Sequence, residues 1–394
     1  MRILHTSDWH LGRSFHGIGL LDAQAAFLDH LVATVVEEAV DLVLVSGDVH
    51  DRALPPVDAV LLADDVLARL AATGVRTVVT SGNHDSAVRL GVHARLADRA
   101  GIHLRTRWQD VGTPVVLEDA HGRVAVHGIP YLEPDAVRQP WALPARTHEA
   151  ALSAAMQRIR HDLAARGPGR TVVLAHAFVA GSPDAAPGLA SDSERDISVG
   201  GIQIAPTSLF AEVSYTALGH LHRAAELTPS IRYSGSPLAY SFSEAGQAKG
   251  SWLVELGATG VERADFVPAP VPRRLHRVRG RLDDLLLDPA LAEAEGSWLA
   301  VTLTDVRRPR SAMDRLRTRF PHTLTLAFEP DGGAAPRPLL PHVSGRTDLD
   351  IALGFVQEVR ELEATTEEEL LLQLACDTCH SNTDPDADQR VEAG

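Results

Sequence analysis

Lysine is almost absent from this chain: 37 of its 394 residues are basic, and Lys249 is the one lysine among them. Arginine has taken the place of lysine throughout, so an arginine-rich stretch carries little information by itself. Cysteine is scarce as well, since the chain has two, both near its C-terminal end. That count excludes a disulfide framework and favours a reducing cytoplasm as the compartment.

Long apolar runs are also missing. No stretch approaches the ~18 consecutive apolar residues that a membrane-spanning helix needs, so the sequence predicts no such helix. The opening residues, MRILHTSDWH, lack the apolar segment and cleavage site of a secretory signal, because a strand-like run begins directly after Arg2. We therefore expect a cytoplasmic protein.

The net charge of −15 argues against a chain that binds nucleic acid by bulk charge alone. The charge is unevenly distributed, however. Residues 1–270 carry a net charge of −8, residues 271–320 one of +4, and residues 321–394 one of −11. The middle segment is thus the one basic region, and the end of the chain is acidic.

Strand-like and helix-like segments alternate along the first part of the chain. Apolar runs predict strands, and stretches with helical spacing follow each of them. These strands are expected at residues 1–6, 41–46 and 75–80, and these helices at 23–39, 57–72 and 87–100. Short β-branched runs come next, at 115–117, 123–127, 171–174, 213–217, 231–233 and 251–256, with a helix at 148–165. The pattern predicts an α/β fold in which two sheets form a sandwich with flanking helices.

Two proline-rich breaks divide the rest of the chain. Residues 265–274 hold three prolines and suit an extended linker, and residues 331–341 form a second, Gly/Pro-rich break. Between the breaks, runs near 276–279, 298–303 and 323–328 predict the strands of a small α+β unit. Beyond them we expect two amphipathic helices, at 349–363 and 367–376, and a polar, disordered segment from 377 on. The predicted domains are 1–268, 269–340 and 341–378, with a disordered tail at 379–394.

Metal-binding residue types recur where the predicted strands end. They are Asp8 and His10, then Asp48 and Asp51, then Asn83, His84 and Asp85, then His176, and last His220 and His222. In open α/β sheets, ligands bind at the carboxyl ends of the strands, so these side chains are expected in one crevice. Positions i and i+2 of a strand point to the same side, so Asp8 and His10 can reach one ion together.

Seven of these residues are candidate metal ligands: Asp8, His10, Asp48, Asn83, His176, His220 and His222. Seven are too many for one ion with an open position, but they suffice for two ions if one carboxylate bridges them. The mixture of carboxylate, imidazole and amide suits Mn²⁺, Fe²⁺ or Zn²⁺ better than an all-oxygen cage for Mg²⁺ or Ca²⁺. Two ions ~3.5–4 Å apart form a clamp for in-line displacement at phosphorus.

The order D-x-H, G-D-x-x-D, G-N-H-D, a lone strand-end histidine and G-H-x-H resembles the signature of the calcineurin-like metallophosphoesterases. The opening MRILHTSDWHLG, the stretch GDVHDRALPP and the segment RYSGSPLAYSFSEA are more specific. They resemble the SbcD-type subunits of the SbcCD nucleases, bacterial counterparts of the Mre11 proteins. The similarity covers residues 1–260 well and the remainder only in outline.

The resemblance implies a role for each candidate residue. Asp8, His10 and His222 would hold one metal, Asn83, His176 and His220 the other, and Asp48 would bridge them. His84 would not be a ligand but would act on the leaving oxygen of the scissile phosphate. Asp51 and Asp85 would support the site, with Asp85 orienting His84 or capping the following helix. Some archaeal relatives have histidine where this chain has Asp51, so the contact that Asp51 makes stays open.

The resemblance also implies a function. The chain would be a Mn²⁺-dependent nuclease subunit, with Mg²⁺, Fe²⁺ or Zn²⁺ as other cofactors to consider, that acts in DNA repair, recombination and replication. It would be a 3′→5′ exonuclease on duplex ends and an endonuclease on hairpins and single strands. Residues 269–340 would cap the site and contact DNA. Residues 341–378 would bind an SbcC-type coiled-coil ATPase, and the chain would form a homodimer through residues near 57–70 or 89–99.

Other interpretations compete with these. The metal site could serve a phosphomonoesterase or a cyclic-nucleotide phosphodiesterase, and the chain could be a scaffold whose site has decayed. Both the stretch 273–281 and the stretch 307–319 could be a solvated arginine face rather than a DNA contact. The sequence C-x-x-C-H at Cys376–His380 matches a haem attachment pattern and half of a zinc site, but two thiols at a frayed helix end are the simpler interpretation. His16, His50 and His127 are expected to be satisfied surface or loop histidines.

Overall fold

The computed structural model describes residues 1–167, 169–181, 191–192, 194, 204–331, 346–360 and 362–381. Residues Met1–Asp331 form one compact unit, and Gly332–Gly394 form a second. The candidate site and the predicted small unit both lie within the first of these.

The first sheet contains the N-terminal strand. Its six strands lie in the order β16-β15-β1-β4-β5-β6. Their bounds are β16 Val261–Pro268, β15 Gly250–Leu256, β1 Arg2–Thr6, β4 Leu42–Ser46, β5 Arg76–Thr80 and β6 Ile102–Leu104. Strands β1, β4, β5 and β6 are parallel, whereas β15 runs antiparallel to β1 and to β16. The carboxyl ends of β1, β4 and β5 therefore share one edge of this sheet.

The second sheet has six strands in the order β13-β14-β12-β9-β8-β7. Their bounds are β13 Ala225–Thr228, β14 Ile231–Tyr233, β12 Tyr215–Gly219, β9 Arg170–His176, β8 Gly122–Ile129 and β7 Val115–Asp119. Its four central strands are parallel, and the edge strands β13 and β7 are antiparallel to their neighbours. Because β9 and β12 are adjacent and parallel, they too end at a common edge.

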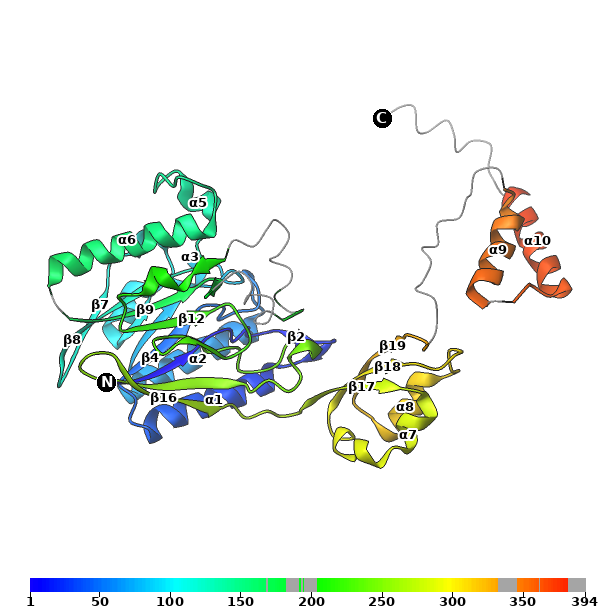
Figure 1. Cartoon of the computed structure of the whole chain (residues 1–394), viewed down its shortest axis with the longest axis horizontal. Coiled ribbons are helices and arrows are strands. Elements are labelled where there is room, and N and C mark those ends of the chain that lie inside the picture. The colour runs from blue at the N-terminus through cyan, green and yellow to red at the C-terminus, as the bar shows by residue number, and fades with distance from the viewer. Residues whose placement is uncertain are drawn as a thin grey trace. The chain divides into compact units, whose positions relative to one another are not determined.

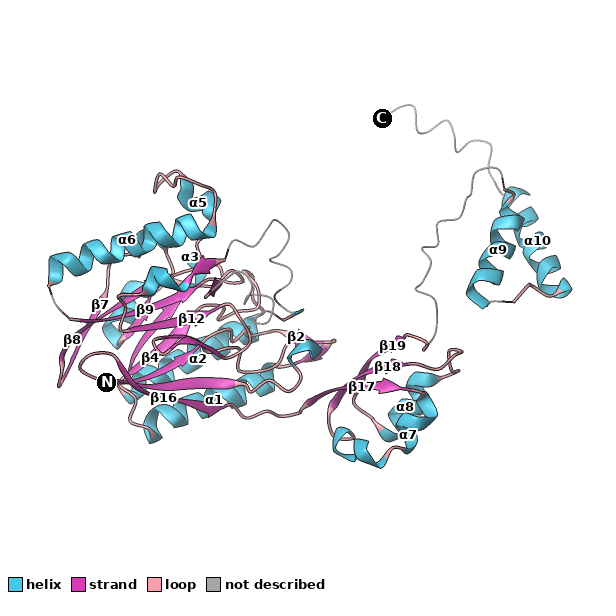
Figure 2. Ribbon diagram, in the orientation of Figure 1, coloured by secondary structure: helices cyan, strands magenta, loops and turns pink. Residues whose placement is uncertain are grey.

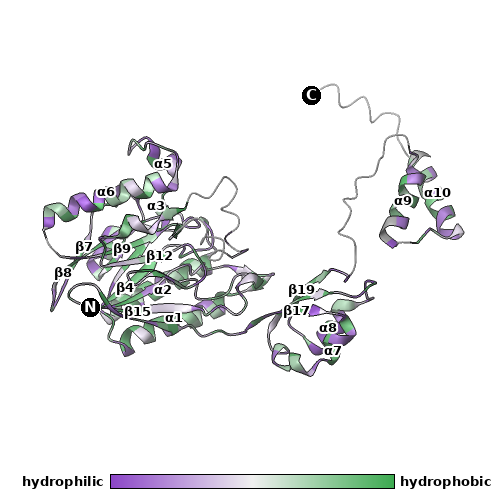
Figure 3. Ribbon diagram, in the orientation of Figure 1, coloured by the Kyte–Doolittle hydropathy of each residue, from purple (hydrophilic) through white to green (hydrophobic). Residues whose placement is uncertain are grey.

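The two sheets pack face to face. Leu42 and Leu44 of β4 are buried against residues of the second sheet such as Val172 and Leu174. The alternating residues Val43 and Val45 face the other way, into a core shared with α1 (Leu21–Glu37) and α2 (Val57–Thr73). On the outer face of the second sheet lie α5 (Pro134–Arg138) and α6 (His148–Arg166). The predicted α/β sandwich is confirmed, with helices on either side of the sheets (Figure 1) and apolar residues along the central strands (Figure 3).

The single helix predicted at 87–100 is wrong. The structure has two short helices, α3 (Ala87–Leu90) and α4 (Ala94–Ala97), followed by a 3-10 turn at Asp98–Ala100. The Thr106 hydroxyl donates a hydrogen bond to the Ala87 carbonyl at 2.7 Å, and a Cβ at Gly91 would overlap that hydroxyl. The chain turns at Gly91 because glycine fits there and is a poor residue for a helix interior.

The small unit is a three-stranded parallel sheet, β17-β18-β19, with its own buried core. Its elements are β17 Leu275–Gly280, α7 Leu282–Leu287, a 3-10 turn Pro289–Ala294, β18 Trp298–Leu303, α8 Ala312–Arg319 and β19 Thr323–Phe328 (Figure 2). Trp298 and Leu275 pack on Phe15 and Phe242 of the larger core. Strand β16 ends at Pro268, so the first four residues of the predicted linker belong to that strand.

The second compact unit contains two helices in contact with each other, α9 (Asp348–Arg360) and α10 (Thr366–Ser381). The disorder predicted from Asp377 on is wrong for Asp377–Ser381, because α10 continues to Ser381. The Thr378 hydroxyl donates to the Leu374 carbonyl at 2.7 Å, which keeps that polar side chain within the helix. Residues 382–394 and most of the predicted break at 331–341 lie outside the described residues. Of the helices that are described, none has both the length and the apolar character to cross a membrane.

Candidate metal centre

The predicted ligands converge at the edge where β1, β4, β5, β9 and β12 end. Three groups of side chains each place their ligand atoms within 4.8 Å of one another. The groups are Asp8, His10 and His222; His10, Asp48 and His84; and Asp8, Asp48 and His176. Shared members link the three groups into one cluster, so motifs more than 200 residues apart in sequence form a single site.

The backbone conformation that brings these side chains together is not the extended one that we expected from strand alternation. Strand β1 ends at Thr6, and Asp8 and His10 lie in the loop beyond it with left-handed backbone angles, φ 54° and 46°. Asp48, after β4, has φ 50°. Aspartate and histidine adopt this region more readily than most residues. Tight turns beyond the strand ends, rather than extended backbone, therefore aim these side chains.

Backbone hydrogen bonds hold these turns against each other. The amides of Asp8 and His10 donate to the carbonyls of Gly47 and Asp48, each at 3.0 Å. Gly47 itself has φ 87°, and a Cβ at this position would overlap the ring of His176. Glycine is required here both by the backbone angle and by the close approach of a candidate ligand.

Asp8, His10 and His222, all buried, form the first candidate metal position. The Nε2 atoms of His10 and His222 lie 3.1 Å apart. Nitrogen ligands bind such cations at about 2.0–2.1 Å, so two adjacent ligands of one ion lie about 3 Å apart. The Asp8 carboxylate accepts hydrogen bonds from the His220 amide, 3.1 Å from each oxygen, and from the Ser7 hydroxyl. These residues fit a divalent cation.

The second position brings together Asn83, His176 and His220. Asn83 Oδ1 lies 2.9 Å from His176 Nε2 and 3.2 Å from His220 Nδ1. His176 Nδ1–H donates to the Ser46 carbonyl at 2.8 Å, which fixes the tautomer and turns the Nε2 lone pair inward. Asp48 Oδ2 lies 3.4 Å from His176 and 3.6 Å from His10, so this carboxylate stands between the two positions.

The electrostatics of the pocket also fit bound cations. Burial opposes the charged form of His176, yet the nearby Asp48 carboxylate outweighs it and raises the pKa of His176 to about 9. Burial lowers the pKa of His220 to about 3. Asp48 is buried as well, but the imidazoles around it hold its pKa well below the ordinary value. Asp48 is thus ionised in the interior, where either a protonated imidazole such as His176 or a bound cation balances its charge.

His84 belongs to one of these groups, with His10 and Asp48, and is only partly buried. Its amide donates to Asp48 Oδ1 at 2.8 Å, and its Nδ1–H donates to the Asp51 carbonyl at 2.8 Å. Its ring is 4.7 Å from the ring of His10, edge to face. With Nδ1 committed to a carbonyl, Nε2 is the ring nitrogen that can face a substrate.

The phosphoesterase motifs match a known family. The family model described as calcineurin-like phosphoesterase matches residues 1–201. The chain belongs to the calcineurin-like phosphoesterase family. Members use two metal ions, so the cluster is that of a metal-dependent hydrolase of phosphate esters.

Two solved structures are similar to this chain at low sequence identity. One is TT1561 of Thermus thermophilus, with 13% identity over 67% of this chain and 98% of that protein and a TM-score of 0.41. The other is a dimetal phosphatase from Danio rerio, with 13% identity over 68% of this chain and 99% of that protein and a TM-score of 0.39. Similarity at this level does not indicate which substrate this chain hydrolyses.

Asp85 does not cap the helix that follows it, and the contacts of its carboxylate are to backbone amides. Its carboxylate accepts backbone hydrogen bonds from Val49 at 3.1 Å, His50 at 2.9 Å and Gly82 at 2.9 Å. The side chain that caps α3 is Ser86. Asp85 therefore ties the loop after β4 to the loop after β5, and so sets the spacing of two phosphoesterase motifs.

Asp51 lies on the outer side of the cluster. Its Oδ1 is 3.4 Å from a guanidinium nitrogen of Arg13 and 3.6 Å from Nδ1 of His10. The Arg13 guanidinium also sits over the ring of Tyr240, 4.9 Å from its centroid. The backbone carbonyl of Asp51 thus accepts the hydrogen bond from His84, and its carboxylate faces His10 and Arg13.

Sequence reasoning missed the residues behind His222. Glu244 Oε1 lies 3.3 Å from His222 Nδ1, Glu194 accepts the His222 amide, and Lys249 bonds the His222 carbonyl. A signal for one of them was present, since Lys249 is the one lysine of the chain. Glu244 lies in the segment RYSGSPLAYSFSEA noted above, whereas Glu194 carries no comparable signal.

Among the described residues, His16, His50 and His127 belong to none of the candidate metal groups. His16 is exposed on the hairpin of β2 (Ser14–Phe15) and β3 (Ile18–Gly19), and His50 contacts Asp85. The expectation for His127 is wrong, because it is fully buried in β8 and pairs with Asp162 at 3.1 Å. Cys376 and Cys379 lie on α10, and none of the candidate metal groups among the described residues contains a cysteine.

Proposed function

We propose that this phosphoesterase is the nuclease subunit of an SbcCD-type complex and hydrolyses DNA phosphodiesters with two Mn²⁺ ions. The observation that carries the proposal is the placement of His84. It lies next to the proposed ligands His10 and Asp48, partly open to solvent, and its amide donates to Asp48 while its Nδ1–H donates to the Asp51 carbonyl. A diester leaves as an alkoxide, which needs a proton, and a fixed imidazole can supply it.

The chain's own residues would divide the work as follows. Asp8, His10 and His222 would hold one ion, Asn83, His176 and His220 the other, and Asp48 both. Two such ions lower the pKa of bound water and neutralise charge on the phosphate. In its doubly protonated form, His84, held through Nδ1–H by the Asp51 carbonyl, would direct Nε2–H at the leaving oxygen and donate that proton there, which leaves the neutral imidazole. Asp85 would keep the loops that carry Asp48 and His84 in register.

The arginines of the small sheet support a DNA substrate. Some already have partners: Arg279 pairs with Glu329 at 2.7 Å, and Arg315 pairs with Asp283. Others are exposed and have no ion pair among the residues that the structure describes. These are Arg274, Arg277, Arg281, Arg307 and Arg310. Exposed, unpaired guanidinium groups are available to DNA phosphates, as expected for a capping domain.

The test is cleavage of a linear duplex and of a DNA hairpin with Mn²⁺ by the purified chain, with a phosphomonoester as the alternative substrate. We expect DNA cleavage by the wild type and a loss of at least ~100-fold in His84→Ser. Bound Mn²⁺ should stay unchanged in this variant, because His84 is not proposed as a ligand. His121→Ser, at an exposed turn, is the matched control and should keep full activity.

Two other outcomes would contradict the proposal. Monoester turnover without DNA cleavage would make the chain a phosphomonoesterase. Failure of the wild type to cleave any of the substrates, alone or with an ATPase partner, would favour a scaffold.

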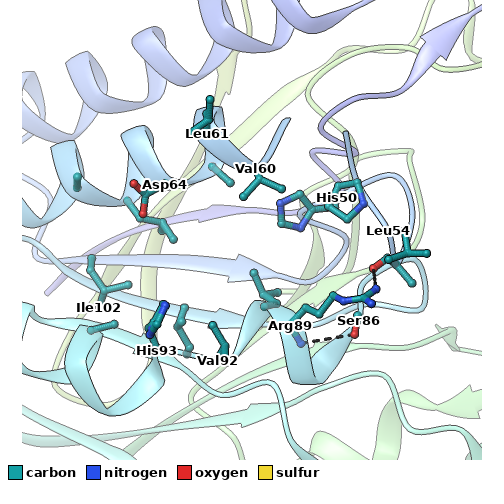
Figure 4. Close-up of a pocket in the computed structure, with 18 of the residues that line it drawn as sticks. His50, Leu54, Val60, Leu61, Asp64, Ser86, Arg89, Val92, His93 and Ile102 are labelled. Atoms are coloured by element: carbon teal, nitrogen blue, oxygen red, sulfur yellow. Dashed lines mark hydrogen bonds between the residues drawn. The ribbon is translucent and has the colours of Figure 1, made fainter. Parts of the chain in front are cut away.

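A homodimer is the second part of the proposal, and an apolar groove on α2 supports it. The groove has a volume of about 770 Å³ and is lined from α2 and from the α3–α4 segment, including Val60, Leu61 and Val92 (Figure 4). Leu61 is 60% exposed and Val92 is 68% exposed. Exposed apolar side chains that gather in one patch often mark a protein–protein interface. Leu61→Glu should halve the mass measured by light scattering, whereas Glu37→Gln on α1 should leave it unchanged.

An ATPase partner is the third part. Phe355, Leu370, Leu371 and Leu374 are all more than half exposed on α9 and α10. Apolar side chains at helical spacing suit docking against another helix pair, here the base of an SbcC-type coiled coil. Leu371→Glu should abolish co-purification with that ATPase and leave Mn²⁺-dependent cleavage by the isolated chain intact. Such a complex would act on DNA in the cytoplasm.

A further inference from the structure

Lys249 and Glu244 enclose His222 from the side opposite the metal cluster. Lys249 Nζ donates to the His222 carbonyl at 2.8 Å and to Glu244 Oε2 at 2.5 Å. The other oxygen of Glu244 lies 3.3 Å from His222 Nδ1. The three residues therefore form a closed triangle of contacts, in which both the backbone and the ring of His222 are fixed.

This triangle lies in the protein interior. Glu244 is 1% exposed and Lys249 is 5% exposed. A buried charge is costly unless it is paired and its hydrogen-bonding capacity is used. Both conditions hold for Lys249, since Ser236 Oγ at 3.1 Å and Gln247 Oε1 at 3.3 Å complete its surroundings. The ion pair also favours the charged form of Glu244 and lowers its pKa.

The choice of lysine at this position is informative because the chain uses arginine for every other basic residue. An ammonium is compact, and its three N–H donors point in three directions from one atom. A guanidinium spreads its donors over a plane and cannot converge on a carbonyl, a hydroxyl and a carboxylate around one point. Because every other basic position is arginine, the lysine at 249 indicates that these three contacts require an ammonium group.

We infer that Lys249 and Glu244 are positioning residues that hold His222 with Nδ1–H toward Glu244 and its Nε2 lone pair toward the first metal position. The inference rests on the proposed ligand role of His222. A carboxylate that accepts the Nδ1–H of a ligating histidine fixes its tautomer and makes it a stronger ligand. Lys249 holds that carboxylate in place and bonds the backbone of the ligand itself.

The two metal positions should respond differently to loss of this pair. His222 belongs with Asp8 and His10, so the first position should weaken. His176 in the second position has its own Nδ1 acceptor, the Ser46 carbonyl. The second position should therefore keep its affinity. A role confined to general folding would instead weaken both positions equally or neither.

The experiment is a titration of the metal-free full-length chain with Mn²⁺, followed by the electron paramagnetic resonance signal of the free ion. Glu244→Gln, Lys249→Met and Lys249→Arg are compared with the wild type. We expect two binding events in the wild type. In each variant, one event should weaken 10- to 100-fold and the other should not change. Asp119→Asn, which breaks the ion pair with Arg170 away from the site, is the matched control and should bind Mn²⁺ as the wild type does.

A double variant separates positioning from folding. Glu244→Gln with Lys249→Met removes both buried charges, so its thermal unfolding without metal should recover relative to Lys249→Met alone, while the weakened binding event should stay weak. Recovery of tight binding in the double variant, or unchanged binding in all single variants, would overturn the inference. If the wild type binds fewer than two Mn²⁺ ions, it is the proposed metal centre that is wrong.

Discussion

The two-sheet core and the small arginine-rich sheet differ in where their charged side chains lie, buried in the first and exposed in the second. The core buries Asp8, Asp48 and Lys249, each at most 5% exposed, whereas the arginines of the small sheet stand mostly in solvent. A buried charge must be surrounded by partners, and it shifts the pKa values of its neighbours. An exposed ion pair contributes ~0–1 kcal/mol and is easily exchanged for another. Charges in the core are therefore fixed by their surroundings, whereas exposed charges of the small sheet can exchange partners, as the proposed contact with DNA would require.

The largest effect that this comparison predicts is at Asp48. Asp48→Asn keeps the shape but removes the charge that lies between the two metal positions. We expect the loss of at least one bound Mn²⁺ and a fall of ~1,000-fold or more in phosphoester hydrolysis, since each carboxylate ligand is part of a clamp. Metal analysis of the dialysed protein and steady-state rates measure this.

Asp314→Asn is the matched control, because Asp314 is an exposed carboxylate in the small sheet unit. It should change neither quantity. Retention of two ions and of activity in Asp48→Asn would mean that burial of this charge serves folding rather than metal binding.

A buried polar group away from the metal positions should respond to pH. His5 lies between the sheets, where its Nε2–H donates to the Leu218 carbonyl at 3.1 Å and its Nδ1 accepts from the Tyr215 hydroxyl at 2.8 Å. Burial lowers the pKa of His5 to about 3. As the pH falls, His5 therefore takes up its proton at a lower pH in the folded state than in the unfolded state. Its contribution to stability is complete above pH ~6.5 and is lost as the pH falls toward 3.

Urea unfolding of the metal-free protein between pH 7.5 and 4.5 measures this contribution. The loss attributable to His5 should be on the order of 2–3 kcal/mol at pH 4.5. His5→Gln, which cannot take up a proton, should show a shallower decline than the wild type over the same range. Parallel pH profiles for the two proteins would contradict the assignment.

The smallest effect is expected in the small sheet. Arg307→Ala and Arg310→Ala should each lower DNA affinity several-fold and reduce the slope of log K against log salt by ~0.9 for each phosphate that is no longer neutralised. Arg315→Ala is the matched control, since Arg315 is paired with Asp283. Binding isotherms at several salt concentrations measure both quantities. An equal loss in all three variants would show that pairing does not decide which arginines bind DNA.

Much of the site could be predicted because its motifs are local. Asp8 and His10 follow β1 directly, and Asn83 and His84 follow β5, so identifying the strands places them at one edge. The backbone conformation could not be predicted in this way. Asp8, His10 and Asp48 are in the left-handed region because two loops bond to each other there, and that pairing joins residues ~40 apart in the chain.

Local patterns in the amino-acid sequence were sufficient to predict the alternation of strands and helices, the sandwich fold and the strand ends at which the candidate metal ligands gather. Each of these follows from periodicity or from short spacings within one segment. Packing in three dimensions was needed to show that Asp85 ties two loops together, that His127 is buried, and that Glu244 and Lys249 stand behind His222. These contacts depend on which side chains the packed sheets bring together, and the hydrophobic pattern of a single segment contains no record of its neighbours in space.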